Sequence, residues 1–188
     1  MTRALVVCVD DDAEMLASVS RSLRRIATLE VRTTTDPEQV LQWIAHEEVA
    51  VLVSDYEMPK MTGAQLASKA RRVRPETVRI LLTGMRSLET AIDGINQGEV
   101  FRFINKPFQD KILHQAVQDG VQRHAELVAL TGERERRERR DALRSALETE
   151  YPGISMVKRT EDLIEVTADP WRDAIALGIS GLDRKLET

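Results

Sequence analysis

Short apolar runs alternate with segments of helical periodicity over roughly the first 120 residues of the chain. The runs are rich in valine, isoleucine and leucine, which is typical of buried strands, and the segments between them repeat apolar residues every three or four positions, which is typical of helices. The predicted strands are Leu5–Val9, Glu30–Thr33, Val49–Ser54, Val78–Leu82 and Val100–Ile104. The first predicted helix has Met15, Leu16, Val19, Leu23 and Ile26 on one face, and the second begins at Asp36 and Pro37. The remaining three are predicted over about Thr62–Val73, over Leu88–Asn96 and from near Gln109 onward.

Five strands in strict alternation with five helices predict an α/β fold built on a single parallel sheet. The strands are mostly apolar, so helices are expected to cover both faces of the sheet. Ligands of such open sheets bind beyond the carboxyl ends of the strands, near the point where the strand order reverses. Polar residues that directly follow the strands are therefore the first candidates for a site.

Polar side chains that suit phosphoryl chemistry follow four of the predicted strands. They are Asp10 and Asp11 after the first strand, Asp55 after the third, Thr83 after the fourth and Lys106 after the fifth. An aspartate can accept a phosphoryl group as an acyl phosphate if the incoming negative charge is neutralised. Three carboxylates suit a hard cation such as Mg2+, which prefers oxygen ligands. A lysine would add a second positive charge, and a threonine hydroxyl would hydrogen-bond a phosphoryl oxygen.

Each of these groups, taken alone, has an ordinary structural explanation. Asp10–Asp12 can be a polar loop that caps the next helix. Asp55 can belong to a turn, Thr83 can close a strand, and Lys106 can be a solvated lysine before a helix. Four such groups at successive ends of one parallel sheet are not expected by chance, so the combination favours a site.

Four segments carry a family resemblance: Leu5–Asp12, Val51–Gly63, Ile80–Gly84 and Asn105–Phe108. Together they resemble the receiver domain of two-component response regulators, over roughly residues 3–120. The resemblance implies a flavodoxin-like, doubly wound sheet of five parallel strands in the order 2-1-3-4-5. It also implies that Asp55 accepts a phosphoryl group from a phosphohistidine on a sensor histidine kinase or a phosphotransfer protein. No enzymatic activity is expected beyond the domain's own phosphoryl uptake and hydrolysis.

The resemblance implies a metal site around the acceptor. Asp10 and Asp11 correspond to the metal-binding acid pair of the family. Asp55 and the backbone carbonyl of Glu57 complete the implied set of protein ligands for Mg2+. Lys106 corresponds to the phosphate-binding lysine.

Two further residues correspond to the family's conformational switch. Thr83 matches the switch hydroxyl, and Phe103 matches the aromatic residue that moves inward when the hydroxyl is drawn to the phosphoryl group. The plain alternative is that Phe103 is a core aromatic of an edge strand. A switch of this kind biases a two-state surface, here the fourth helix, fifth strand and fifth helix. An unidentified downstream protein is expected to contact that surface.

A narrower resemblance concerns Arg79–Gly84, Ala91–Gly98 and Phe101–Phe103, which are similar to receivers of hydrogenase regulators and of cyclic di-GMP phosphodiesterases. Those relatives continue into ATPase, DNA-binding or phosphodiesterase domains. Here some 70 residues follow the receiver, and they carry no familiar output domain. We expect a receiver domain over residues 1–120, an extended last helix over 109–149 and a small tail over 150–188.

The extended last helix has apolar residues spaced for pairing with another helix, among them Val121, Val128, Leu143 and Leu147. This spacing predicts a coiled coil, and hence a homodimer or a partner helix. Between them lies Glu133–Arg140, five arginines against three glutamates. We interpret it as a solvated face with charge pairs, and the alternative is a DNA-binding helix. A bend at Gly132 is a further option.

The tail begins with a break at Tyr151–Gly153. Ile154–Lys158 and Leu163–Thr167 then predict a hairpin across Arg159–Asp162. Asp169 and Pro170 predict the start of a final helix that contains Trp171. We expect the tail to be a packing or protein-docking element.

The net charge of the chain and its single cysteine bear on which partners and which cellular compartment are expected. A formal net charge of -4 and a pI near 5.5 do not favour nucleic acid. Cys8 lies in an apolar run, so a buried thiol in a reducing compartment is expected. The opening apolar run is too short for a signal peptide or a membrane span, so the cytoplasm is the expected location and no membrane is expected as a partner.

A haloacid dehalogenase-like phosphatase is the remaining alternative. Such enzymes place two aspartates after the first strand, a threonine after a later strand and a lysine beyond it, and Asp10, Asp12, Thr83 and Lys106 imitate that order. They also need an acidic pair downstream of the lysine to hold Mg2+. Here the acids suited to a metal precede the lysine.

Overall fold

A computed structural model describes residues 3–84, 100–152, 157–160 and 163–166. The chain divides into two units, Met1–Leu130 and Thr131–Thr188. The strands of the first unit are β1 (Ala4–Val9), β2 (Leu29–Thr34), β3 (Val49–Asp55), β4 (Val78–Thr83) and β5 (Arg102–Asn105). Its helices are α1 (Ala13–Leu23), α2 (Pro37–His46), α3 (Gly63–Val73) and the first part of α5 (Asp110–Glu150).

Within the described residues, these elements follow the predicted alternation, and several boundaries differ from the predicted ones. The helix predicted over Leu88–Asn96 lies outside the described residues. Ile26 was expected on the first helix, but α1 ends at Leu23 and Ile26 packs against the core from the following turn. The last strand begins at Arg102 rather than Val100.

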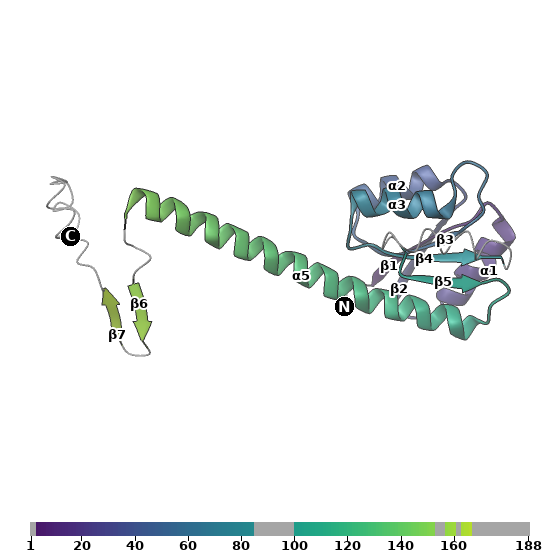
Figure 1. The fold of residues 1–188 in the computed structure, drawn as a ribbon. Coiled ribbons are helices and arrows are strands. Elements are labelled where there is room, and N and C mark those ends of the chain that lie inside the picture. Colours follow the sequence, from purple (N-terminus) through teal and green to yellow (C-terminus); the bar gives the residue numbers. More distant parts are fainter. Residues whose placement is uncertain (1–2, 85–99, 153–156, 161–162, 167–188) are drawn as a thin grey trace, which may run out of the picture. The chain divides into compact units, whose positions relative to one another are not determined.

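The five strands form one parallel sheet in the order β2-β1-β3-β4-β5, as the family resemblance implies (Figure 1). Strand β3 is central, and its residue Val53 is paired with Cys8 of β1 and Ile80 of β4. β2 and β5 are the edges. The order reverses between β1 and β3, so their carboxyl ends mark the switch point at which ligands of such sheets bind.

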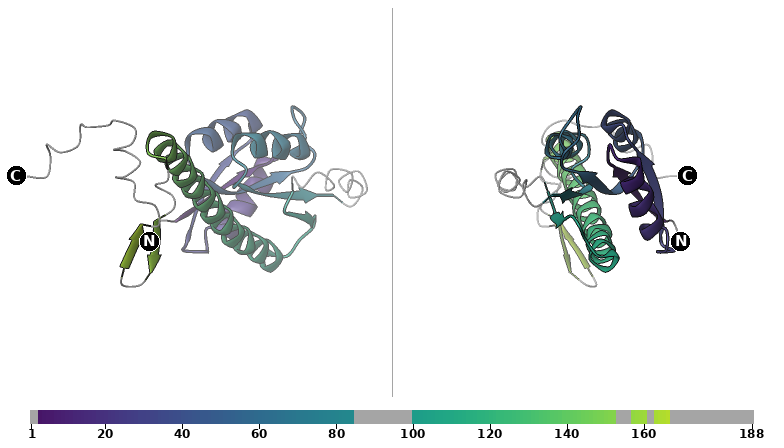
Figure 2. Two further views of the ribbon diagram at one scale, coloured as in Figure 1. Left: turned by 60° about the vertical axis from the view of Figure 1, so that its left-hand side comes forward. Right: turned by 90° about the vertical axis from the view of Figure 1, so that its right-hand side faces the viewer.

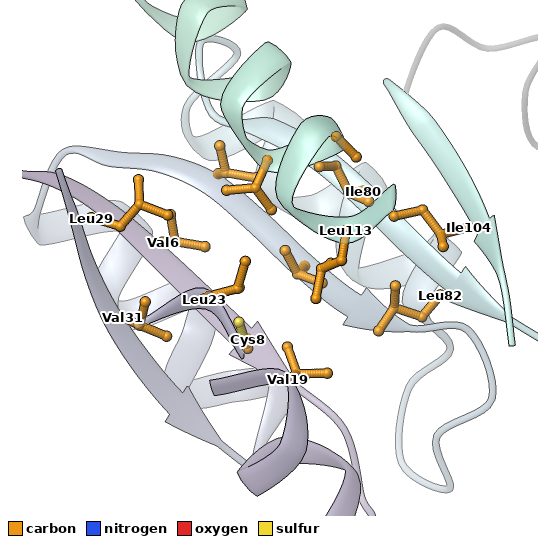
Figure 3. Close-up of a cluster of buried hydrophobic side chains, with 14 of the residues drawn as sticks. Val6, Cys8, Val19, Leu23, Leu29, Val31, Ile80, Leu82, Ile104 and Leu113 are labelled. Atoms are coloured by element: carbon orange, nitrogen blue, oxygen red, sulfur yellow. The ribbon is translucent and has the colours of Figure 1, made fainter. Parts of the chain in front are cut away.

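Helices cover both faces of the sheet, and each face has its own apolar core. Side chains that alternate along the strands pack on one face beneath α1 and the first turns of α5, as Figure 3 shows around Val6, Ile80 and Leu113. The other face packs against α2 and α3, with Leu52, Ile44 and Leu66 fully buried. Two views in Figure 2 show α2 and α3 on the side opposite to α1. Each fully buried Leu or Ile contributes about 1.5–3 kcal/mol, so the two cores hold the sheet and its strand ends firmly.

Side-chain caps set where three helices begin. The Asp12 carboxylate accepts the backbone N–H groups of Glu14 and Met15 at the start of α1. Asp36 caps α2, as predicted, and Thr62 forms a capping box with Gln65 at the start of α3. Such caps satisfy backbone donors that the helix itself cannot pair. The caps at Asp12 and Thr62 lie in the loops that follow β1 and β3, and therefore help to fix those loops.

Helix α5 is continuous from Asp110 to Glu150, and it includes Gly132. Its buried residues recur every three or four positions from Leu113 to His124. Gly120 allows a close approach to the sheet, because an added Cβ would lie 3.2 Å from a methyl of Val51. Among the described residues, no helix is both long enough and apolar enough to cross a bilayer.

The second unit contains the predicted hairpin with a shifted turn. β6 (Val157–Thr160) pairs antiparallel with β7 (Leu163–Val166), and Thr160 is opposite Leu163. Only two residues connect the strands, so the prediction that Arg159–Asp162 forms the turn was wrong: Arg159 and Thr160 belong to β6. The start of the predicted first strand and the predicted helix at Asp169 lie outside the described residues.

Candidate functional site

The polar residues predicted from the strand ends lie at one edge of the sheet. Asp10 follows β1 directly and is buried, whereas its neighbour Asp11 is exposed. Asp55 and Thr83 are themselves the last residues of β3 and β4, and both are buried. Lys106 comes directly after β5. All these strands run parallel, so their carboxyl ends meet at the same edge.

Three carboxylates converge at this edge. Asp10, Asp11 and Asp55 each offer an oxygen, and these oxygens lie within 4.8 Å of one another. A set of carboxylate oxygens is what hard divalent cations such as Mg2+ prefer. Asp12 is not part of this set, because its carboxylate caps α1. The structure therefore brings together the acids that the sequence singled out, and gives the next aspartate a structural role.

Lys106 supplies the positive charge of the site. Its Nζ lies 2.6 Å from Asp55 Oδ1 and 2.9 Å from Asp10 Oδ2. Burial lowers the pKa of Lys106, but the hydrogen bonds and charges of Asp55 and Asp10 outweigh it, so the pKa lies above its ordinary value. The backbone N–H of Lys106 donates to the carbonyl of Thr83 at 2.7 Å, which ties the lysine to the end of β4. Lys106 therefore bridges two acids as a cation.

Asp55 is held in an environment that opposes its charge. Burial raises the pKa of the Asp55 carboxyl, Lys106 lowers it, and the neighbouring Asp10 raises it, with a net shift upward. The backbone N–H of Glu57 donates to Asp55 Oδ2 at 2.9 Å. One carboxylate oxygen therefore contacts Lys106 and the other contacts a backbone donor, which fixes the orientation of the side chain.

Thr83 and Phe103 lie beside this cluster on neighbouring strands. The Thr83 hydroxyl is at the end of β4 and donates to the carbonyl of Gly84 at 3.1 Å. Phe103 is half-buried on the edge strand β5, opposite Leu81. The strand positions match the resemblance, and the roles of the two residues in a switch stay a prediction.

Gly63 has a part in the site that the sequence alone did not reveal. It is the first residue of α3, and its backbone N–H donates to the carbonyl of Tyr56 at 2.9 Å. A Cβ at this position would lie 2.2 Å from the backbone oxygen of Asp55. The loop after β3 can therefore fold tightly over Asp55 only with glycine here. The glycine was visible in the sequence, but the atom that it approaches was not.

Comparison with known proteins identifies one family. The family described as "Response regulator receiver domain" matches residues 6–118 of the chain. The hydrogenase transcriptional regulatory protein HoxA of Bradyrhizobium diazoefficiens is 30% identical over 118 residues, which are 62% of this chain and 24% of HoxA. The DNA-binding transcriptional regulator NtrC of Azospirillum brasilense is 27% identical over 130 residues, which are 69% of this chain and 27% of NtrC. The chain thus spans about a quarter of the length of these curated relatives.

Solved structures agree with this similarity. The signal receiver domain of an HD domain-containing protein from Pseudomonas fluorescens Pf-5 superposes with a TM-score of 0.61 at 29% identity. The match covers 66% of this chain and 98% of that domain. The similarity is therefore to a whole receiver domain and involves the part of the chain that contains the acid cluster.

Proposed function

The chain belongs to the response regulator receiver domain family, and on that premise we propose that Asp55 is the side chain that accepts the phosphoryl group. Domains of this family carry signals in two-component systems. We further infer that Asp10, Asp11 and Asp55 are the metal ligands of this chain and that Lys106 is its phosphate-binding cation.

The contact between Lys106 and Asp55 carries the proposal. A buried carboxylate at the end of the central strand has a lysine ammonium 2.6 Å away, and the same ammonium contacts Asp10. A phosphoryl group on Asp55 would bring additional negative charge into this site. A cation already in place stabilises that charge without having to reorganise, which is the form of electrostatic assistance that is most effective in a partly buried site.

The donor set also fits Mg2+. Three carboxylate oxygens lie close together at the edge of the sheet, one residue of the set is exposed, and backbone carbonyls of the same loop are the other available donor type. Asp10, Asp11, Asp55 and the backbone carbonyl of Glu57 would hold the ion. When bound, it would neutralise part of the carboxylate charge and of the incoming phosphoryl charge.

Phosphoryl uptake requires the protein to orient one oxygen of Asp55 for attack. The N–P bond of a phosphohistidine donor breaks, an O–P bond to a carboxylate oxygen of Asp55 forms, and the donor histidine leaves as free imidazole. The N–H of Glu57 holds Asp55 Oδ2, and Lys106 holds Oδ1. The Thr83 hydroxyl, one strand away, would hydrogen-bond a phosphoryl oxygen in place of its bond to Gly84.

Labelling with a small phosphoryl donor tests this assignment. Acetyl phosphate with Mg2+ should phosphorylate the wild-type chain, and Asp55→Ala should abolish the label. Asp12→Ala is a matched control, because its carboxylate caps α1 outside the cluster and its loss should leave labelling in place. If Asp55→Ala were labelled as strongly as wild type, the assignment would be wrong.

The proposed partners follow from the same chemistry. A sensor histidine kinase or a phosphotransfer protein is the proposed phosphoryl donor, and a protein that contacts the receiver surface is the proposed target. The expected cytoplasmic location stays a prediction. No observation favours the two alternative functions. Asp12 is occupied as a helix cap, unlike the second acid of a haloacid dehalogenase-like site, and arginines of the basic segment pair with acids of α5 itself.

We also propose that α5 mediates a homodimer through its exposed apolar residues rather than along its whole length. Glu133–Asp141 is charged at every position, and its residues form ion pairs four positions apart, such as Arg134 with Glu138 at 2.7 Å. Any heptad register places charged residues at the central positions of this stretch, so it is poorly suited to a coiled-coil seam. Leu143 is exposed and lies one turn from Leu147, which makes that end the better contact.

Light scattering tests the dimer. The chain has a mass of 21.2 kDa, and we expect twice that value in solution. Leu143→Glu should restore the monomer mass, whereas Thr149→Glu, a polar position near the same end, should not. Repeating the measurement with beryllofluoride and Mg2+ shows whether phosphorylation changes the assembly. A monomeric wild type under both conditions would contradict the proposal.

A further inference from the structure

A groove of about 590 Å3 lies between α1 and the carboxyl end of β2. No residue of the proposed phosphoryl site lines this groove, neither Asp55 nor the surrounding Asp10, Asp11, Glu57, Thr83 and Lys106. Its apolar lining is Ala13, Leu16 and Ala17, and small side chains on this face of α1 leave the space open. Its polar lining is Ser20, Arg21, Arg24 and the three threonines Thr33–Thr35. The volume lies within the range of about 300–1,000 Å3 that is usual for small-molecule sites.

The two arginines have no acid partner among the described residues. Neither Arg21 nor Arg24 forms an ion pair or a side-chain hydrogen bond there, whereas the adjacent Arg25 pairs with Asp110 at 3.4 Å. The acids nearest to the groove in sequence are Asp12, Glu14 and Asp36. Asp12 and Asp36 cap α1 and α2, and Asp36 also pairs with Lys60 at 3.8 Å. The charged residues that line the groove are therefore two arginines, and neither has an ion-pair partner in the described part of the chain.

The threonines add hydroxyl groups to this positive lining. Thr34 is already used, since its hydroxyl donates to Gln39 Oε1 at 2.6 Å. The hydroxyls of Thr33 and Thr35 have no hydrogen bond within the described residues. Guanidinium groups and free hydroxyls are the donors that bind phosphate oxygens in proteins.

We propose that this groove binds a small organic phosphate of about nucleotide size, with the phosphate group between Arg21 and Arg24. Residues three apart on a helix are neighbours, and like charges at that spacing repel each other. A phosphate between them removes the repulsion, and the planar guanidinium can donate two parallel hydrogen bonds to it. The apolar residues Ala13, Leu16 and Ala17 then contact the organic part. The negative end of the α1 dipole also favours arginines here, but it does not account for the open groove or the free hydroxyls.

NMR titration of the full chain with two probes, AMP and inorganic phosphate, tests this inference. EDTA is present, so that no divalent ion links a phosphate to the Asp10 and Asp55 carboxylates. We expect AMP to shift the amide signals of residues 13–24 and 33–35, and to bind more tightly than inorganic phosphate. Arg21→Gln combined with Arg24→Gln should weaken AMP binding by roughly tenfold or more, which corresponds to the loss of at least one charge-assisted hydrogen bond.

Arg25→Gln is the control, because it removes one arginine charge from the same end of α1 at a residue that is paired with Asp110. It should leave AMP binding unchanged. Three results would overturn the proposal: no shift in the groove with either probe, equal loss of binding in the control, or shifts confined to the loops that contain Asp10, Asp55 and Lys106. Because no step of this test involves phosphoryl transfer, its failure would leave the proposed role of Asp55 intact.

Discussion

Replacing Gly63 by alanine should damage both the stability of the domain and its phosphoryl uptake. The added Cβ would lie 2.2 Å from the backbone oxygen of Asp55 and 3.0 Å from a methyl of Leu81. The φ angle of Gly63 is outside the left-handed region, so the cost is steric. The oxygen belongs to the backbone of the central strand β3, and it would have to move by about 1.3 Å or more to reach an ordinary contact distance.

The expected loss of stability in Gly63→Ala follows from the free-energy cost of overpacking. Extra atoms in a tight site typically cost about 1–3 kcal/mol, and the gain of replacing glycine in a helix, about 0.5–1 kcal/mol, offsets only part of it. The upper end of the cost applies, because the clash is with a backbone atom, so the net loss is about 2 kcal/mol. For a urea m-value of about 2 kcal/mol/M, this loss lowers the unfolding midpoint by about 1 M. Labelling by acetyl phosphate should also slow, because any shift of the backbone moves the Asp55 carboxylate relative to Lys106.

Urea unfolding followed by circular dichroism measures the first effect, and the rate of labelling measures the second. Gly84→Ala is the control, since it lies near the same sheet edge and a Cβ there would have no atom of the described residues within 4 Å. Its midpoint should equal that of wild type. The reasoning would be refuted if Gly63→Ala unfolded at the wild-type urea concentration, because the steric cost at Asp55 would then be absent.

Three further predictions concern charge and burial. Lys106→Met should slow labelling by acetyl phosphate by about two orders of magnitude, the usual cost of losing a preorganised charged donor. Lys60→Met, which changes an exposed lysine, should not slow it, and equal labelling rates in the two variants would argue against a role for Lys106. His124→Ala should lower the free energy of unfolding, measured with urea, by about 1–3 kcal/mol, because the buried ring donates from Nδ1 to the Glu76 carbonyl at 2.8 Å. His46→Ala, which changes an exposed histidine, should lower it less, and a larger loss for His46→Ala would contradict this prediction. Burial raises the pKa of the Cys8 thiol to about 12. At about pH 8 the thiol therefore stays protonated and should not react with Ellman's reagent until the chain is unfolded. Rapid reaction in the native state would show that Cys8 is accessible, against this prediction.

The sheet and the acid cluster could be predicted from the sequence, because they follow from the periodicity of the apolar residues and from the positions of the polar residues at the strand ends. Valine-rich runs between helical segments determine which residues end each strand, and parallel strands place those ends together. Asp10 and Asp55 therefore could be placed near each other without a structure. Their exact partners could not be inferred in this way, since the contact of Lys106 with both acids depends on the path of the chain after β5.

Contacts made by backbone atoms were beyond the sequence. The approach of Gly63 to the Asp55 carbonyl depends on how the loop after β3 closes, and glycine alone does not identify its neighbour. The hairpin turn was placed too early because Arg159 and Thr160 have side chains that suit either a turn or a strand. Asp12 could have joined the acid cluster or capped α1, and only the structure shows that it is the cap.

Borohydride trapping is the measurement that tests the central claim most directly. Reduction of an aspartyl phosphate converts that aspartate to homoserine, which peptide mass spectrometry can locate. After reaction with acetyl phosphate and Mg2+, we predict homoserine at position 55. Homoserine at position 10, 11 or 12, or at none of these four positions, would contradict the account.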